Sequence, residues 1–112
     1  MRAPRLNRAL VLEAPERLPD GAGGFFGGWQ VLGTLWAQIT AGSGAERAGE
    51  AVQLSRTRLR IIVRAAPFDA PSRPKPEQRF RDGQRVFNIL SVAEGDADAR
   101  YLICQAEEEV AS

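Results

Sequence analysis

Three groups of residues in this sequence have the types that chemistry requires. Residues 19–29 (PDGAGGFFGGW) hold five of the eleven glycines within eight positions, which raises the question of a phosphate-binding loop. One short segment carries a row of arginines: Arg56, Arg58, Arg60 and Arg64. The single cysteine, Cys104, is the one candidate for a thiol nucleophile.

The glycine-rich stretch lacks the spacing of a nucleotide-binding loop. Gly21 and Gly23 are followed at the required third position by Phe26, and no Lys-Ser or Lys-Thr pair follows. The stretch also lies between two strand-like segments, whereas a phosphate cradle opens a helix. We therefore expect a turn that Pro19 and Asp20 start, in which the glycines adopt conformations that other residues resist.

The rest of the sequence also offers few residues that could act in catalysis. The chain has no histidine, which removes the commonest general base and metal ligand. Asp96 and Asp98 lack the remaining positions of a calcium loop. With no histidine to activate it, Cys104 is expected to be a small buried core residue. The sequence predicts a protein that is not an enzyme, with no catalytic, cofactor-binding or metal site.

Length and composition are those of one soluble globular domain over residues 1–112, with 44% apolar and 26% charged residues. No apolar run approaches the roughly 18 residues of a membrane helix, so no membrane partner is expected. Residues 1–85 carry 14 basic and 8 acidic side chains (+6), and residues 86–112 carry 1 and 6 (−5). Such a chain can meet its own copies head to tail, although two well-solvated ends explain the asymmetry equally well.

Alternation of apolar and polar residues predicts about six short strands. The first is expected at 6–14, bounded by Pro4 and Pro15, the second at 29–40 and the third at 57–64; residues 79–81 pair back on 84–93 around a type I′ turn at Asp82-Gly83, and a last strand starts at 100. These elements sum to an all-β fold, a small β-barrel with a long loop or short helix between the second and third strands.

Four further segments stand out: a long hairpin tip at 15–28, an excursion at 41–54, a proline-rich loop at 66–77 and an acidic tail at 105–112. Within the acidic tail, Glu107, Glu108 and Glu109 are expected to form a frayed, solvated end. Within the excursion, Ser43 and Glu46 have the spacing of a capping box, which indicates a marginal helix. In the second strand, Gly33 is typical of a bulge. Two outcomes are open for Trp36: the bulge turns it into the core, or it makes a subunit contact.

The third strand has one apolar face and one basic face. Leu59, Ile61 and Val63 face one way, while Arg56, Arg58, Arg60 and Arg64 share the other face with Ile62. Such a row can neutralise phosphates, pair with carboxylates of a neighbouring chain, or keep an edge strand soluble. The sequence leaves these three roles open.

Several segments taken in order resemble the phage head–tail joining family, the small head-completion proteins of long-tailed phages and gene transfer agents. They are LNRALVLEAP, PDGAGGF, the following tryptophan, TLWAQI, GSGAER, RLRIIVR and GQRVFNILSV. The resemblance covers about residues 5 to 105. The chain departs from the family at FGG before Trp29, where polar residues are more frequent, and in the proline-rich segment 66–77.

The resemblance implies a β-barrel virion protein at the head–tail interface, assembled in the bacterial cytoplasm. It implies a homo-oligomeric ring, a hexamer or a dodecamer, beneath the portal and adaptor. As a stopper the ring would retain the packaged double-stranded DNA and offer a docking surface to the tail terminator or tail tube. The adaptor position in the same connector is one alternative. A monomeric OB-like or SH3-like nucleic-acid-binding barrel is another, although the aromatic residues do not interleave with the arginine row.

The resemblance also suggests roles for particular residues. The excursion points toward the channel in such proteins, which implies a gating loop formed by Ser43, Gly44, Glu46, Arg47 and Glu50. The arginine row would contact acidic residues of the next subunit or line the DNA path. A tip that carries Phe25 and Phe26 exposes apolar surface, so we expect both residues at a protein–protein contact in the assembled connector.

Overall fold

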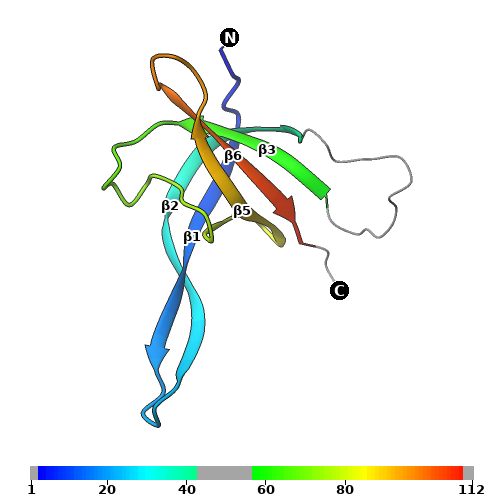
Figure 1. Cartoon of the computed structure of the whole chain (residues 1–112). Helices are drawn as coiled ribbons and strands as arrows, with labels where there is room; N and C mark the ends of the chain where they lie inside the picture. Colours follow the sequence, from blue (N-terminus) through cyan, green and yellow to red (C-terminus); the bar gives the residue numbers. More distant parts are fainter. Residues whose placement is uncertain (1–2, 43–56, 110–112) are drawn as a thin grey trace, which may run out of the picture.

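The computed structural model describes residues 3–42 and 57–109, except for the side chains of Phe25 and Phe26. It contains six strands: β1 (Arg8–Pro19), β2 (Phe25–Ala41), β3 (Thr57–Arg64), β4 (Arg79–Asp82), β5 (Arg85–Glu94) and β6 (Tyr101–Glu108). They close into an antiparallel barrel in the order β1-β2-β3-β6-β5-β4 (Figure 1). The predicted all-β fold, a small barrel of about six strands, is therefore confirmed. The capping box falls outside the described residues.

The core lies inside this barrel and receives side chains from every strand. Alternate residues point inward, because successive side chains of a strand face opposite sides. The fully enclosed side chains are Leu10, Leu12, Ala37, Ile61, Val63, Phe80, Phe87, Ile89, Leu102, Cys104 and Ala106. Cys104 is thus the buried core residue that the sequence predicts.

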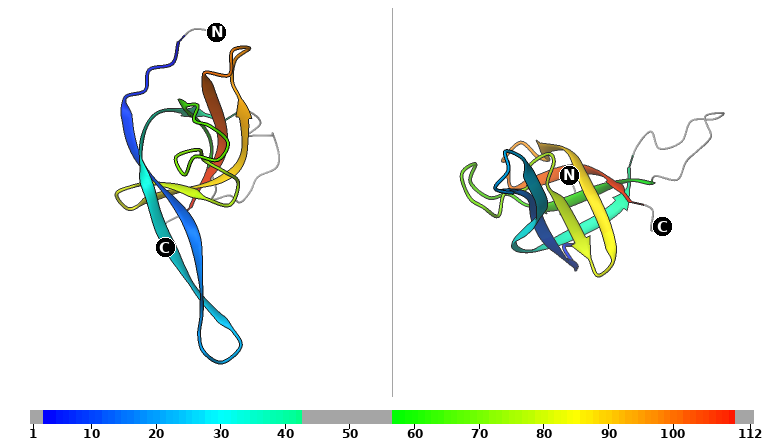
Figure 2. Two further views of the ribbon diagram at one scale, coloured as in Figure 1. Left: turned by 90° about the vertical axis from the view of Figure 1, so that its left-hand side faces the viewer. Right: turned by 90° about the horizontal axis from the view of Figure 1, so that it is seen from below.

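The hairpin of β1 and β2 extends well beyond the barrel (Figures 1 and 2). The two strands pair from Arg8↔Ala37 to Pro19↔Phe25, whereas β1 pairs with β4 only from Val11 to Glu13. The predicted end of the first strand at Pro15 is wrong, and so is the start of the second at Trp29. Proline is tolerated here because this part of β1 has no strand partner on its second side in the described chain, so no ladder donor is required.

A carboxylate organises the tip of this hairpin. Asp20 Oδ1 accepts hydrogen bonds from the backbone N–H groups of Ala22 and Gly24 at 2.8 and 3.0 Å. These two bonds, the Ala22 bond foremost, hold the pKa of Asp20 below its usual value. Gly21 and Gly23 have φ values of 83° and 87°, where side chains are strained. The glycines at these two positions therefore serve a turn.

A β-bulge divides β2 into two registers. Gly33 lies opposite Leu12 and Val31 opposite Glu13, which leaves Leu32 as the extra residue. An extra residue exchanges the two faces of a strand. Trp36 on one side of the bulge and Val31 on the other are consequently both exposed, by 60% and 57%. Of the two outcomes for Trp36, burial in the core is excluded.

Two expectations about the second half of the chain need correction. The β4–β5 turn has Gly83 and Gln84 at its centre, and Asp82 still pairs with Arg85. Gln84 is not among the described non-glycine residues with positive φ, which are Glu77 and Ala99. Gly83, at 64°, is therefore the one central residue of this turn with positive φ, as in a type II′ rather than a type I′ turn. The predicted frayed end at Glu107, Glu108 and Glu109 is also wrong, because β6 continues to Glu108.

Candidate assembly surfaces

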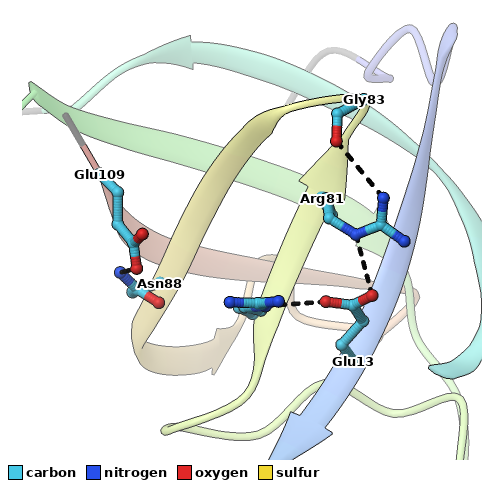
Figure 3. A network of polar contacts seen from close by, with 6 residues as sticks. Glu13, Arg81, Gly83, Asn88 and Glu109 are labelled. Atoms are coloured by element: carbon cyan, nitrogen blue, oxygen red, sulfur yellow. Dashed lines mark hydrogen bonds and ion pairs between the residues drawn. The ribbon is translucent and has the colours of Figure 1, made fainter. Parts of the chain in front are cut away.

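A carboxylate between two arginines lies on the outer face of the barrel, where the hairpin leaves it. Glu13 of β1 is directly opposite Arg79 of β4, and Arg81 is two residues further along the same strand. Arg79 Nε donates to Glu13 Oε1 at 2.7 Å, and Arg81 Nε donates to Oε2 at 2.9 Å (Figure 3). The two guanidiniums cover Glu13 so that it is only 4% exposed. Each carboxylate oxygen thus has its own charged donor.

The charges of this cluster are mutually stabilising. Burial alone would raise the pKa of Glu13, but the hydrogen bonds from Arg79 and Arg81 and the attraction of their charges outweigh it. The pKa of Glu13 is therefore below its usual value of 4.5. Glu13 is ionised at neutral pH and holds β1 against β4.

The cluster reaches the second strand through an aromatic ring. The guanidinium carbon of Arg79 lies 3.9 Å from the centre of the Trp29 ring, a cation–π contact. Because Trp29 belongs to β2, one arginine links three strands at the base of the hairpin. Sequence reasoning missed this site. The available signal was a glutamate inside the apolar run LVLEA and an Arg-x-Arg pattern at 79–81, but only the strand pairing brings them together.

In the structure, the arginines of the row on β3 have different environments. Arg58 lies opposite Glu107 of β6, and its Nε donates to that carboxylate at 3.3 Å. Arg64 lies over the Tyr101 ring at 5.7 Å. Arg60 is half-buried, and its Nε has no hydrogen-bond partner among the described residues. Arg56 falls outside them.

The acidic residues at the end of β6 are occupied within the subunit. Arg85 donates to Glu108 twice, at 2.8 and 3.0 Å, and this pairing holds the pKa of Glu108 below its usual value. Asn88 Nδ2 donates to Glu109 Oε2 at 3.0 Å (Figure 3). The ion pairs Arg85–Glu108 and Arg58–Glu107 therefore cancel part of the charge asymmetry of the sequence within one subunit.

The remaining predicted site residues are placed only in part. Phe25 and Phe26 begin β2 at the far end of the hairpin, opposite Pro19 and Leu18. The gating residues Ser43, Gly44, Glu46, Arg47 and Glu50 lie outside the described residues. The stems of their segment are joined, because Ala41 pairs with Leu59 and the backbone N–H of Gly42 donates to the carbonyl oxygen of Arg58 at 3.0 Å.

Few features of the described residues offer other chemistry. Burial raises the pKa of the Cys104 thiol to about 12, so it remains protonated at neutral pH. Residues 3–42 and 57–109 contain no cluster of three or more carboxylate, cysteine or histidine side chains that could hold a metal ion. They also contain no helix of the length and apolar character that crossing a membrane requires.

Comparison with solved structures finds two informative neighbours. A chain from a structure described as the virion of a native gene transfer agent particle is 57% identical, with a TM-score of 0.81; the match covers 98% of this chain and all of the other. A solution structure of a protein from Shigella flexneri 2a has a TM-score of 0.69 over 96% of both chains, but at 23% identity it shows a shared fold only. No curated protein matches.

Comparison with family models covers nearly the whole sequence. The model described as phage head completion protein matches residues 1–109. That range includes all six strands, the hairpin and both flanks of the excursion. The chain therefore belongs to the phage head completion protein family, whose members are structural components of the virion and not enzymes.

Proposed function

We propose that this protein is a head-closure protein, or stopper, of the head–tail connector. The observation that carries the proposal is the 57% identity, over 98% of the chain, to a chain of a gene transfer agent virion. In this role, copies of the barrel form a ring of six or twelve subunits beneath the portal and adaptor. The ring retains packaged double-stranded DNA and presents a surface to the tail.

The fold suits this role because the β1–β2 hairpin and the segment between β2 and β3 both extend from a rigid barrel. Where the six strands close into the barrel, each strand is paired on both sides, so the base of the subunit keeps its shape within an assembly. The excursion at 41–54 is the proposed channel loop, and it begins at the end of β2, where Ala41 is paired with Leu59 of β3. The hairpin, with Phe25 and Phe26 at its far end, is the proposed contact with a neighbouring ring.

Deletion of residues 43–50 tests the gate. We expect particles that contain this variant to assemble rings and yet to lose their DNA, because the constriction is missing while the barrel is intact. The measurement is the fraction of DNA-filled heads after nuclease treatment, with tail attachment scored by electron microscopy. A second variant replaces the same residues with a Gly-Ser sequence of equal length. It distinguishes an effect of the side chains from an effect of the length of the loop. Heads that retain DNA and join tails normally would refute the gate.

The arginine row gives a second test, because its members are in different states. Arg58 is already paired with Glu107 inside the subunit, whereas Arg60 and Arg64 have no carboxylate partner among the described residues. We expect Arg60→Ser with Arg64→Ser to reduce ring formation or DNA retention. Arg58→Ser is the matched control, since an exposed ion pair contributes at most about 1 kcal/mol. Unchanged particles from the double variant would leave the row with a role in solubility only.

A further inference from the structure

The outer faces of β2 and β5 point in opposite directions. In the closed order β1-β2-β3-β6-β5-β4, each of these strands is three positions from the other around the barrel. Side chains that leave the barrel from β2 and from β5 therefore lie on opposite sides of the subunit. Both faces carry exposed apolar residues, and they differ in the charge that surrounds them.

The β2 face is apolar and unusually free of charge. The seventeen residues of β2 include no charged residue and no proline. Trp29, Val31 and Trp36 are exposed by 40%, 57% and 60%, and the bulge puts all three on the outer side. Exposed strands normally carry charges or proline as protection against association. An exposed apolar stripe without them is typical of a protein–protein contact.

The rim of the β2 face is basic. Arg79 and Arg81 lie beside the stripe on β4, and Glu13 lies between them, so two positive charges and one negative charge leave +1. Arg79 contacts Trp29 directly. A partner of this face should therefore combine apolar side chains with acidic ones.

The opposite side of the same subunit has this combination. Leu90 is the extra residue of a bulge in β5 and is 43% exposed. β5 then ends with exposed Ala93 on this outer face, and the β5–β6 connection adds Asp96 and Asp98. Arg100 contacts both aspartates, so two carboxylates and one guanidinium leave a charge of −1. The side chain of Asp98 is 73% exposed.

We infer that the Trp29–Val31–Trp36 face of one copy packs against Leu90 and the acidic β5–β6 connection of the next copy. The occupant is a second copy, because joining this chain head to tail brings apolar surface against apolar surface and a charge of +1 against a charge of −1. Two different faces on opposite sides form a heterologous contact, which a cyclic ring requires. The inference rests on the ring of the proposed function and names the surfaces that join its subunits.

Cysteine cross-linking in assembled particles tests the contact. The double variant Val31→Cys, Leu90→Cys is incorporated into particles, oxidised with copper phenanthroline and analysed on non-reducing gels. We expect a ladder of dimers, trimers and higher species, because each subunit offers one cysteine to each neighbour. Native Cys104 does not interfere, since it is buried within the barrel. Either single variant should remain monomeric, and so should the control Val31→Cys, Ser72→Cys, whose second cysteine lies in the exposed β3–β4 connection.

Three results would overturn the inference. Dimers from Val31→Cys alone would show a two-fold contact between β2 faces, and cross-links to another particle protein would show a different occupant. Absence of a ladder in particles with normal protein content would exclude the contact. These outcomes can be told apart from those of the deletion of residues 43–50. Particles of the cysteine variant that retain DNA but give no ladder refute only the contact. A ladder, combined with normal DNA retention after the deletion, refutes only the stopper role.

A second measurement applies if the double variant does not enter particles. Purified Val31→Glu keeps an intact β5 face, and purified Leu90→Glu keeps an intact β2 face. We expect neither to self-associate and a mixture to form a one-to-one pair, measured by size-exclusion chromatography with light scattering. A mixture that remains monomeric would contradict the heterologous contact.

Discussion

Replacing Phe80 with alanine is expected to lower the free energy of unfolding by about 3 to 5 kcal/mol. Phe80 is fully buried and lies opposite Leu12 of β1 and Phe87 of β5. It is also the one fully buried side chain of β4, which has only four residues. Its loss removes the inner anchor of the strand and leaves a cavity that three strands cannot easily close.

Urea unfolding followed by tryptophan fluorescence measures this effect. Domains of this size are stable by about 5 to 15 kcal/mol, so the change is a large part of the total. Phe68→Ala is the matched control, because Phe68 is 75% exposed and contacts the guanidinium of Arg73. We expect it to cost less than about 1 kcal/mol. Equal costs for the two variants would contradict the role of Phe80 in the barrel.

The closure of the barrel depends on β4 in a way that bears on assembly. β4 joins β1 on one side and β5 on the other, through three and four residue pairs. Its side chains alternate: Arg79 and Arg81 lie outside against Glu13, and Phe80 lies inside. Loosening β4 therefore frees the base of the hairpin and, with it, the arrangement of the β2 face. Stability and assembly should be lost together in Phe80→Ala.

Strands with regular alternation were predictable from the sequence. β3 has the predicted bounds, because Leu59, Ile61 and Val63 alternate with a second face of arginines and Ile62, and no proline or glycine interrupts the strand. The hairpin was predicted too short, because Pro15 normally ends a strand and the sequence does not reveal that β1 has a free side there. The barrel itself followed from the number of strands and their short connections.

The candidate site was less predictable, because it depends on pairs that are distant in sequence. Glu13 and Arg79 are 66 positions apart, and nothing local to either residue indicates the register that places them opposite each other. The run of consecutive acidic residues Glu107-Glu108-Glu109 by itself predicts a solvated tail. Arg58 and Arg85, the partners of Glu107 and Glu108, belong to the strands on either side of β6. Which charged residues form ion pairs can be predicted only when the order of the strands in the sheet is known.

Replacing Glu13 with glutamine is expected to lower the free energy of unfolding by about 2 kcal/mol at pH 7. The substitution keeps the shape of the side chain and removes the charge between Arg79 and Arg81. Breaking a buried ion pair from one side costs about 3 to 5 kcal/mol. The cost is smaller here because the arginine side chains are 17% and 34% exposed and can regain water. Arg85→Gln, which breaks the exposed pair with Glu108, is the matched control, expected to cost no more than about 1 kcal/mol.

The difference in free energy of unfolding between the native protein and Glu13→Gln should depend on pH. This dependence distinguishes an effect of the Glu13 charge from an effect of its packing. The pKa of Glu13 is lower in the folded protein than its usual value of 4.5, so its ionised form stabilises the fold above that value. As pH falls through the folded pKa, the carboxyl becomes neutral and resembles glutamine. The stability of the native protein should therefore approach that of Glu13→Gln in acid, although both lose stability through Asp20, Asp96 and Glu108, whose pKa values are also lowered. A difference that stays constant from pH 7 to pH 3 would mean that Glu13 acts through its shape and not through its charge, and that the arginines of β4 do not hold the hairpin electrostatically.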